Sequence, residues 1–174
     1  MSKAKKLAFC AVMIALALAL SYAERFIPLQ LVIPLPGVKL GLANVVTLVA
    51  LYLLGWKRTV PIVLIRCLLG ALFGSLTGLL FSLTGGLLSL GVMALCKRLP
   101  LFSVYGVSIL GAAAHNIGQI LAAMVLMNSV YISAYLPYLL IAAIVTGLLT
   151  GGVCARILQV LPKASVSVPA QMGK

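Results

Sequence analysis

The chain has 174 residues, of which 64% are hydrophobic and 8% charged, with a formal net charge of +12 at pH 7. A soluble domain carries about a quarter charged residues, so this composition indicates an integral membrane protein with room for roughly six helices of about 20 residues each. Aspartate is absent and Glu24 is the only glutamate, which excludes chemistry that depends on clustered carboxylates.

The basic residues lie in small groups between the apolar runs: Lys3/Lys5/Lys6, Lys57/Arg58, Lys97/Arg98 and Arg156/Lys163/Lys174. Such groups follow the positive-inside rule and orient membrane helices, and they do not indicate nucleic-acid binding. We expect an all-α membrane domain over residues 1–162, with six transmembrane helices and both termini cytoplasmic, in a bacterial plasma membrane. Residues 163–174 are expected to form a disordered cytoplasmic tail.

The first predicted span runs from about Lys6 to Tyr22. Ala11, Ala15 and Ala19 recur every four residues, which gives the helix a smooth face suited to docking against another helix. The same segment resembles a cleavable signal peptide, but a signal sequence does not need such a face. We therefore expect the helix to be retained.

An outer loop is predicted over residues 24–41. Pro28, Pro34 and Pro36 prevent a continuous helix, because proline lacks an amide donor and restricts the residue before it. Apolar residues between the prolines predict that this loop packs back onto the bundle as a cap or lid.

A buried arginine is predicted in the third span. The second span covers about Leu42 to Gly55, and the third begins near Val60. Arg66 lies roughly 12 Å beyond Arg58 along the helix, well inside the hydrocarbon layer. An arginine there needs either structural partners, such as Glu24 or backbone carbonyls, or a polar cavity that binds a ligand.

The next reversal of the chain is predicted between Gly74 and Gly86, because one helix through both flanking spans would be far longer than a bilayer is thick. The stretch 81–86, with sequence FSLTGG, is expected to present the hydroxyls of Ser82 and Thr84 and exposed backbone amides at this turn.

The fifth predicted span, about Val104 to Met127, carries a polar cluster. It contains the only histidine, His115, beside Asn116 and four residues before Gln119. Residues four apart share a helix face. At this depth such side chains hydrogen-bond to neighbouring helices or to a ligand, and the sequence leaves both possibilities open.

The last predicted span starts near Pro137, which suits the first turn of a helix, and ends at Arg156. Its small residues recur every four positions and predict close packing against another helix.

Together these features predict one positively charged cavity near the outer half of the bundle. Its candidate substrate-binding residues are Arg66, His115, Asn116, Gln119, Ser82, Thr84, Lys39 and Asn44. A cavity without acids but with donors and acceptors suits a small organic anion, or a polar ring with an apolar body. No catalytic residue, metal ligand or cofactor is expected.

The lack of clustered carboxylates also argues against two classes of enzyme. Nucleotide hydrolysis needs a phosphate-binding glycine loop with lysine and a magnesium-holding acid. Prenyl-diphosphate chemistry needs carboxylates that hold magnesium against the diphosphate. Because the sequence has neither, we expect that the chain is not an enzyme and that another protein supplies any transport energy.

Several blocks of the sequence resemble the Gx transporter family, whose members are often labelled heptaprenyl diphosphate synthase component I. The resemblance covers about residues 5–160. The blocks that carry it are Glu24–Pro28, Pro36–Asn44, Phe81–Gly86, Gly106–Ser108, His115–Gln119 and Tyr135–Pro137.

That family is similar to the substrate-binding S components of energy-coupling factor (ECF) vitamin transporters. The resemblance implies a six-helix S-component fold that takes its substrate from outside and docks on a membrane coupling subunit driven by two cytoplasmic ATPases. It also implies docking through an alanine face on the first helix, which Ala11, Ala15 and Ala19 match, with Ala4/Ala8 as an alternative register. The alternative function is a non-catalytic membrane component of heptaprenyl diphosphate or isoprenoid quinone synthesis, and an imported compound could itself be isoprenoid- or quinone-related.

Overall fold

The computed structural model describes residues 3–27 and 39–160, and this part of the chain is helical with no β-strand. The α-helices are α1 (Lys3–Ala23), α2 (Asn44–Leu54), α3 (Trp56–Leu72), α4 (Leu76–Cys96), α5 (Val104–Leu126) and α6 (Leu136–Val160). Two short 3₁₀ helices are η1 (Glu24–Phe26) and η3 (Val130–Tyr135). The predicted all-α bundle of six helices is confirmed. The tail 163–174 lies outside the described residues, and so do residues 28–38 of the predicted outer loop 24–41.

Four helical segments are long and apolar enough to cross a membrane: α1, α4, α5 and the run Val130–Val160. The chain is therefore a multi-pass membrane protein. The second predicted span is shorter than expected, since α2 has 11 residues and extends only about 16 Å against a hydrocarbon thickness of about 30 Å. The helix α3 begins at Trp56 instead of near Val60. That all six helices cross the membrane stays a prediction.

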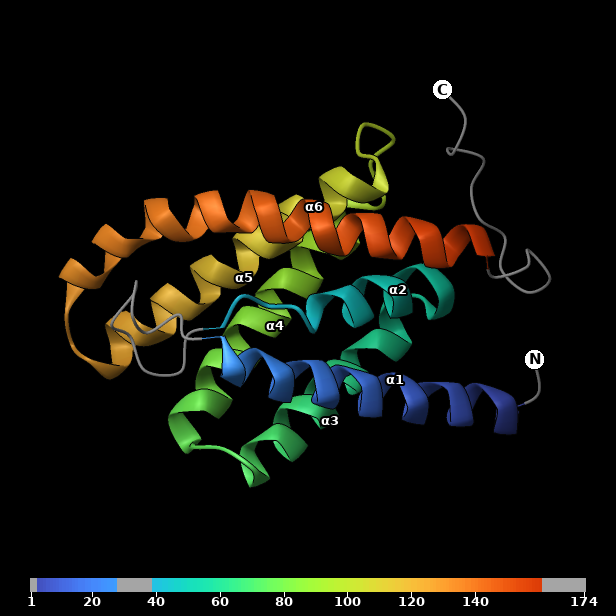
Figure 1. Ribbon diagram of the computed structural model, residues 1–174, viewed down its shortest axis with the longest axis horizontal. Helices are drawn as coiled ribbons and strands as arrows, with labels where there is room; N and C mark the ends of the chain where they lie inside the picture. The colour runs from blue at the N-terminus through green and yellow to red at the C-terminus, as the bar shows by residue number, and fades with distance from the viewer. Residues whose placement is uncertain (1–2, 28–38, 161–174) are drawn as a thin grey trace.

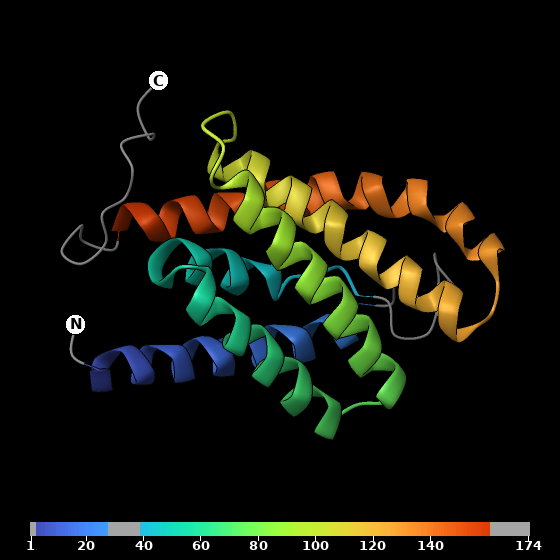
Figure 2. The ribbon, with the colours of Figure 1, turned by 180° about the vertical axis from the view of Figure 1, so that it is seen from behind.

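The bundle is built around α5, which packs against α4 on one side and α6 on the other. Figure 2 shows α4 lying between α3 and α5. The helix α1 rests on α3 and α2. The start of α1 and the end of α6 lie at the same end of the bundle (Figure 1), as expected if both termini are on one side of the membrane, although which side stays a prediction.

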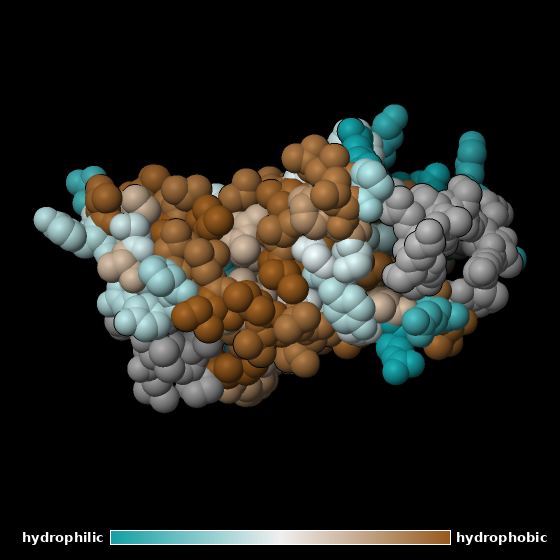
Figure 3. All heavy atoms as spheres, turned by 90° about the horizontal axis from the view of Figure 1, so that it is seen from above, coloured by the Kyte–Doolittle hydropathy of each residue, from teal (hydrophilic) through white to brown (hydrophobic). Residues whose placement is uncertain are grey.

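The molecular surface has the distribution expected of a membrane protein. An apolar band covers the middle of the face in Figure 3, and hydrophilic side chains gather toward the two ends. Large apolar side chains on this surface include Leu72, Val125 and Ile141, which are 77%, 81% and 65% exposed. Because lipid is as apolar as these side chains, their exposure costs little in a bilayer.

Serine caps and glycines fix where the helices begin and where the chain turns. Ser75 accepts a hydrogen bond from the Gly78 amide at the start of α4, and Ser103 does the same for Gly106 at the start of α5. Each satisfies one of the amides that a helix N-terminus leaves without a partner. Gly55 separates α2 from α3 with a φ of 78°, which glycine adopts without strain.

The reversal between α3 and α4 falls at residues 73–75, the beginning of the predicted interval. The stretch 81–86 therefore lies within α4, and the expectation of exposed amides at a turn there is wrong. Its amides belong to a continuous helix that begins at Leu76, directly after the Ser75 cap.

Small residues let α4, α5 and α6 approach closely. A Cβ on Gly118 of α5 would lie 2.8 Å from the Cα of Gly85 on α4, and one on Gly147 of α6 would lie 2.6 Å from the Cα of Ile109 on α5. The hydroxyls of Ser108 and Thr150 share a hydrogen bond of 2.7 Å between α5 and α6. The glycines thus act as packing devices in the sense that the sequence predicts.

Lys97 lies directly after α4 and contacts the end of α2. Its Nζ donates to the Leu51 carbonyl at 2.9 Å and lies 4.7 Å from the centre of the Tyr52 ring. Leu51 belongs to the last turn of α2, where carbonyls lack intrahelical partners and a cation is favourable. Burial lowers the pKa of Lys97.

Candidate binding site

The polar cluster of α5 faces the segment that leads into α2. Gln119 is fully buried and forms a pair of hydrogen bonds with the backbone of Lys39: its Oε1 accepts from the Lys39 amide at 3.1 Å, and its Nε2 donates to the Lys39 carbonyl at 3.2 Å. The same Nε2 lies 2.6 Å from Nε2 of His115. Gln119 therefore fixes both the end of the outer loop and the orientation of the histidine.

The hydrogen bond from Gln119 also determines the tautomer of His115. An amide nitrogen can only donate, so Nε2 of His115 accepts and the ring proton is on Nδ1. His115 is 3% exposed, and its ring contacts the backbone of Gly85 on α4 through the edge that carries Nδ1. A Cβ on Gly85 would lie 2.8 Å from Nδ1, so the lack of a side chain at this position lets the ring pack directly on the backbone of α4.

Asn44 lies on the opposite side of the histidine ring. It is 3% exposed, and neither its Nδ2 nor its Oδ1 has a hydrogen-bond partner among the described residues. Gly41, with a φ of 82°, separates the two side chains: a Cβ there would lie 2.8 Å from Asn44 Nδ2 and 2.9 Å from His115 Cδ2. Both the backbone conformation and the close approach require glycine at this position.

Arg66 is 6% exposed and enters the same region from α3. Its Nη1 donates to the Ser21 hydroxyl at 3.4 Å, while Nε and Nη2 have no hydrogen-bond partner among the described residues. A Cβ on Gly86 would lie 3.1 Å from Nη2. Because Gly85 and Gly86 are neighbours on α4, Nη2 of Arg66 and the ring of His115 approach one short stretch of that helix.

Glu24 is 4% exposed and lies just beyond the end of α1. Its Oε1 accepts a hydrogen bond from the Leu42 amide. Burial raises the pKa of the Glu24 carboxyl, against the opposing effects of the Leu42 and Gly41 amides and of the positive charges on Lys39 and Arg66. Of the partners that the sequence left open for Arg66, Glu24 forms no hydrogen bond with it among the described residues, since Nε and Nη2 have no partner and Nη1 donates to Ser21.

The structure brings Ser82 into the site and leaves Thr84 outside it. Lys39 Nζ donates to the Ser82 hydroxyl at 3.2 Å. Thr84 is exposed, and its hydroxyl donates to the Leu80 and Phe81 carbonyls of its own helix. The expectation that Thr84 faces the cavity is wrong, because position 84 falls on the outward face once the whole stretch is helical.

Asn116 is buried but turns toward α6, away from His115. Its Nδ2 donates to the Leu139 carbonyl at 2.7 Å, and its Oδ1 has no partner among the described residues. This contact is a hydrogen bond between helices, one of the two roles that the sequence left open for the residue.

A cavity of about 430 Å³ opens between the end of α1, the end of α3 and Lys39. Leu18, Tyr22 and Phe73 are among the residues that line it, and Ser21, the partner of Arg66, lies at its wall. The cavity thus adjoins the buried cation. Its volume is in the range of small-molecule sites.

Sequence reasoning missed Ser21, Gly41 and the position of Glu24 in this site. Gly41 and Glu24 stand at the two ends of the proline-rich segment, so a search for residues that anchor the loop could have found them. Ser21 gave no signal in the sequence. It meets Arg66 only through the packing of α1 on α3.

The alanine face of α1 points away from the bundle. Ala11, Ala15 and Ala19 are exposed, as are Ala4 and Ala8 of the alternative register, and Ala17 is the only buried residue of the helix. The structure therefore leaves both registers available to another protein. Among the described residues, no three His, Cys, Asp or Glu side chains lie together in a group that could hold a metal ion.

The fold and this cluster define a class: a multi-pass, all-helical membrane protein whose buried polar residues surround a cation. The model of the family described as heptaprenyl diphosphate synthase component I matches residues 13–158. The chain belongs to that family, in agreement with the label that its sequence blocks suggested. No curated protein and no solved structure matches the chain.

Proposed function

We propose that this chain is the substrate-binding, S-component-like subunit of an ECF-type ATP-driven importer, and that it captures a small organic anion. One observation carries the proposal. Buried nitrogen and oxygen atoms of Arg66 and Asn44 have no hydrogen-bond partner among the described residues. Both side chains lie near His115, since Gly41 lies between Asn44 and His115 and Gly86, beside Arg66, adjoins Gly85, which contacts His115. An unpaired buried polar atom is costly, and more so inside a membrane, so a cluster of them is accounted for by a ligand that completes their hydrogen bonds.

The chemistry of the free atoms indicates an anion. Arg66 offers two nitrogen donors on one guanidinium, which matches the two oxygens of a carboxylate or phosphate. Asn44 adds an amide that can both donate and accept. The adjoining cavity, with Leu18, Tyr22 and Phe73 in its wall, suits an apolar or aromatic body attached to that anionic group.

The energy for uptake is assigned to other subunits. The only acidic side chain of the chain, Glu24, accepts a hydrogen bond from the Leu42 amide, and a single such residue is sparse equipment for proton-driven transport. The exposed alanine face of α1 offers a smooth surface for a membrane coupling subunit, which two cytoplasmic ATPases would drive. The chain itself is not an enzyme in this proposal.

Mass spectrometry of small molecules that the purified protein retains tests the binding step. We expect the wild-type protein to retain an anionic compound, and Arg66→Ala to lose it. Removal of one partner from a buried charged contact costs roughly 2–5 kcal/mol, or about 30-fold or more in affinity. Arg58→Ala is the matched control, because Arg58 is exposed on the same helix. Equal retention by wild type and Arg66→Ala would contradict the proposal.

Purification from native membranes tests the assembly step. A complex that contains a membrane coupling protein and ATPases supports the importer role, and a chain that never co-purifies with them argues against it. Because Arg66→Ala leaves the α1 surface intact, this variant is expected to assemble normally while it fails to bind, which separates the two steps.

The family description favours a second function, that of a non-catalytic membrane component of heptaprenyl diphosphate or isoprenoid quinone synthesis. In this role the chain would hold or supply a polyprenyl substrate to a soluble aspartate-rich synthase, which would provide the magnesium-binding carboxylates that this sequence lacks. Synthase activity that arises only when this chain is added to such a partner would favour the second function.

A further inference from the structure

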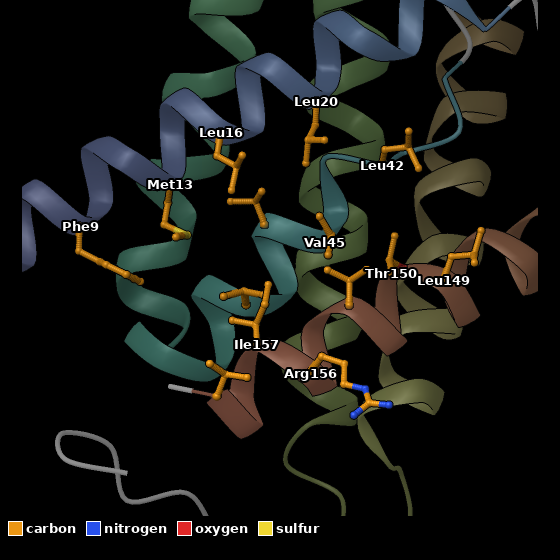
Figure 4. A pocket seen from close by; sticks show the side chains of 14 residues that line it. Phe9, Met13, Leu16, Leu20, Leu42, Val45, Leu149, Thr150, Arg156 and Ile157 are labelled. Carbon is orange, nitrogen blue, oxygen red and sulfur yellow. The ribbon is translucent and has the colours of Figure 1, made fainter. Parts of the chain in front are cut away.

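A second cavity, of about 760 Å³, lies between α1, α2 and α6, and neither Arg66 nor His115 lines it. In Figure 4 the side chains of Phe9, Met13 and Leu16 extend from α1 toward the α2 segment and α6. Val153 and Ile157 belong to the opposite wall and Val49 to the floor. We refer to this cavity as the α1/α6 groove.

The groove exists because α1 and α6 do not pack on each other. The helix α1 contacts α2 and α3, and α6 contacts α2, but α1 and α6 share no contact among their described residues. The wall is apolar apart from Thr150 and Arg156, and the Thr150 hydroxyl is already bonded to the Thr146 carbonyl and to Ser108. Water would find no partner there, so a hydrocarbon chain is the favourable occupant in a bilayer.

Positive charge lies at one end of the groove. Arg156 belongs to its wall near the end of α6 and is exposed. On α1, Lys6 precedes Phe9 by three residues and Met13 by seven, which places it on the same helix face as the groove-lining side chains. The only acidic residue of the chain, Glu24, is at the far end of α1, so no carboxylate offsets these cations.

We propose that the α1/α6 groove binds an anionic phospholipid of the leaflet at the basic end of the bundle. One acyl chain lies along the apolar wall, and the phosphate contacts Arg156. Charge complementarity selects this occupant: the guanidinium prefers a phosphate, and the groove accepts the attached hydrocarbon. This lipid site is separate from the anion site at Arg66 and does not depend on the proposed transport function.

Native mass spectrometry of the purified chain, titrated with phosphatidylglycerol against phosphatidylcholine, tests the lipid site. We expect the wild-type protein to retain one phosphatidylglycerol in preference to phosphatidylcholine. Arg156→Gln is expected to weaken that retention by roughly fivefold, the effect of losing one cation next to an anionic lipid. Arg58→Gln, an exposed arginine outside the groove, is expected to leave it unchanged.

A second pair of variants tests the groove itself. Val153→Trp places a large side chain in the wall and is expected to displace the acyl chain. Val145→Trp is the matched control, because both valines are on α6 with similar exposure, 51% and 56%, and Val145 is not in the wall of the groove. Only the first substitution should abolish the retained lipid.

Three results would overturn the proposal. They are equal retention of both lipids, equal loss in Arg156→Gln and Arg58→Gln, and retention of a polyprenyl phosphate or of a partner protein in place of the phospholipid. The Arg66→Ala experiment measures a different ligand, so failure of the lipid site would leave the proposed importer function standing, and the reverse also holds.

Discussion

The helices α5 and α1 show opposite relations between polarity and burial. The helix α5 buries twelve of its 23 residues, among them His115, Asn116 and Gln119. The helix α1 carries no polar side chain between Lys6 and Ser21, yet Ala17 is its only buried residue out of 21. In a soluble protein the more apolar helix would be expected inside.

The difference shows which force arranges this bundle. Lipid is as apolar as leucine, so hydrophobicity does not drive a helix into the interior of a membrane protein. Hydrogen bonds and close backbone packing do so instead, and α5 has both. For this chain, buried polar residues identify the inside, and an apolar helix is free to face lipid or another protein.

The largest effect is expected where α5 packs on the backbone of α4. Gly118→Leu should lower the free energy of unfolding by roughly 3 kcal/mol, because its side chain would collide with the backbone of Thr84 and Gly85 on α4. Thermal and denaturant unfolding of the purified protein would measure it. Gly91→Leu is the control, since a Cβ there meets nothing within 4 Å. If both variants are equally stable, the close packing of α4 on α5 is refuted.

Gln119→Leu should have the next largest effect on stability, roughly 2 kcal/mol. It removes the bonds to both backbone groups of Lys39 and to His115 and leaves buried groups without partners. Hydrogen exchange at the Lys39 amide, together with unfolding, would detect the loss. Gln159→Leu, at an exposed position near the end of α6, should change neither. An unchanged Lys39 amide in the first variant would contradict the proposed role of Gln119.

Glu24→Gln should change how stability depends on pH. Burial raises the pKa of Glu24 above its ordinary 4.5 in the folded protein, so the folded state holds the proton more tightly than the unfolded state. The contribution of this group to stability is therefore full below pH 4.5 and is lost as the pH rises through the higher folded pKa.

Unfolding measured from about pH 4 to about pH 8 tests this dependence. The wild type should lose stability with rising pH relative to the Gln variant, whose amide oxygen can still accept the Leu42 hydrogen bond. If the wild type instead gains stability relative to Glu24→Gln, the direction of the pKa shift is wrong.

The smallest effect on stability is expected on α1. Ala15→Leu changes an exposed position and should alter the free energy of unfolding by no more than about 0.5 kcal/mol. In native membranes, however, the larger side chain should reduce co-purification of the proposed coupling subunit. Val145→Leu, exposed on α6, is the control for assembly. Loss of stability without loss of assembly would show that the α1 face has a structural role instead.

Much of the site was predictable because polar residues are conspicuous in an apolar chain. Arg66, His115 and Gln119 could be selected from the sequence since each must be accounted for within the membrane. Thr84 could not be excluded in the same way. Whether a hydroxyl at that position faces a cavity or its own helix depends on where α4 starts, and the cap at Ser75 that fixes this start is a single hydrogen bond.

Composition and the spacing of charges by themselves determined that this is an all-helical, multi-pass membrane protein, because long apolar runs favour the bilayer and groups of basic residues favour its edges. Only the tertiary structure decided which polar atoms meet. The contacts of Lys39 with Gln119, 80 positions apart, and of Arg66 with Ser21, 45 apart, depend on how α1, α3 and α5 pack. The sequence pattern of each single helix does not encode that packing, since lipid and protein neighbours are equally apolar.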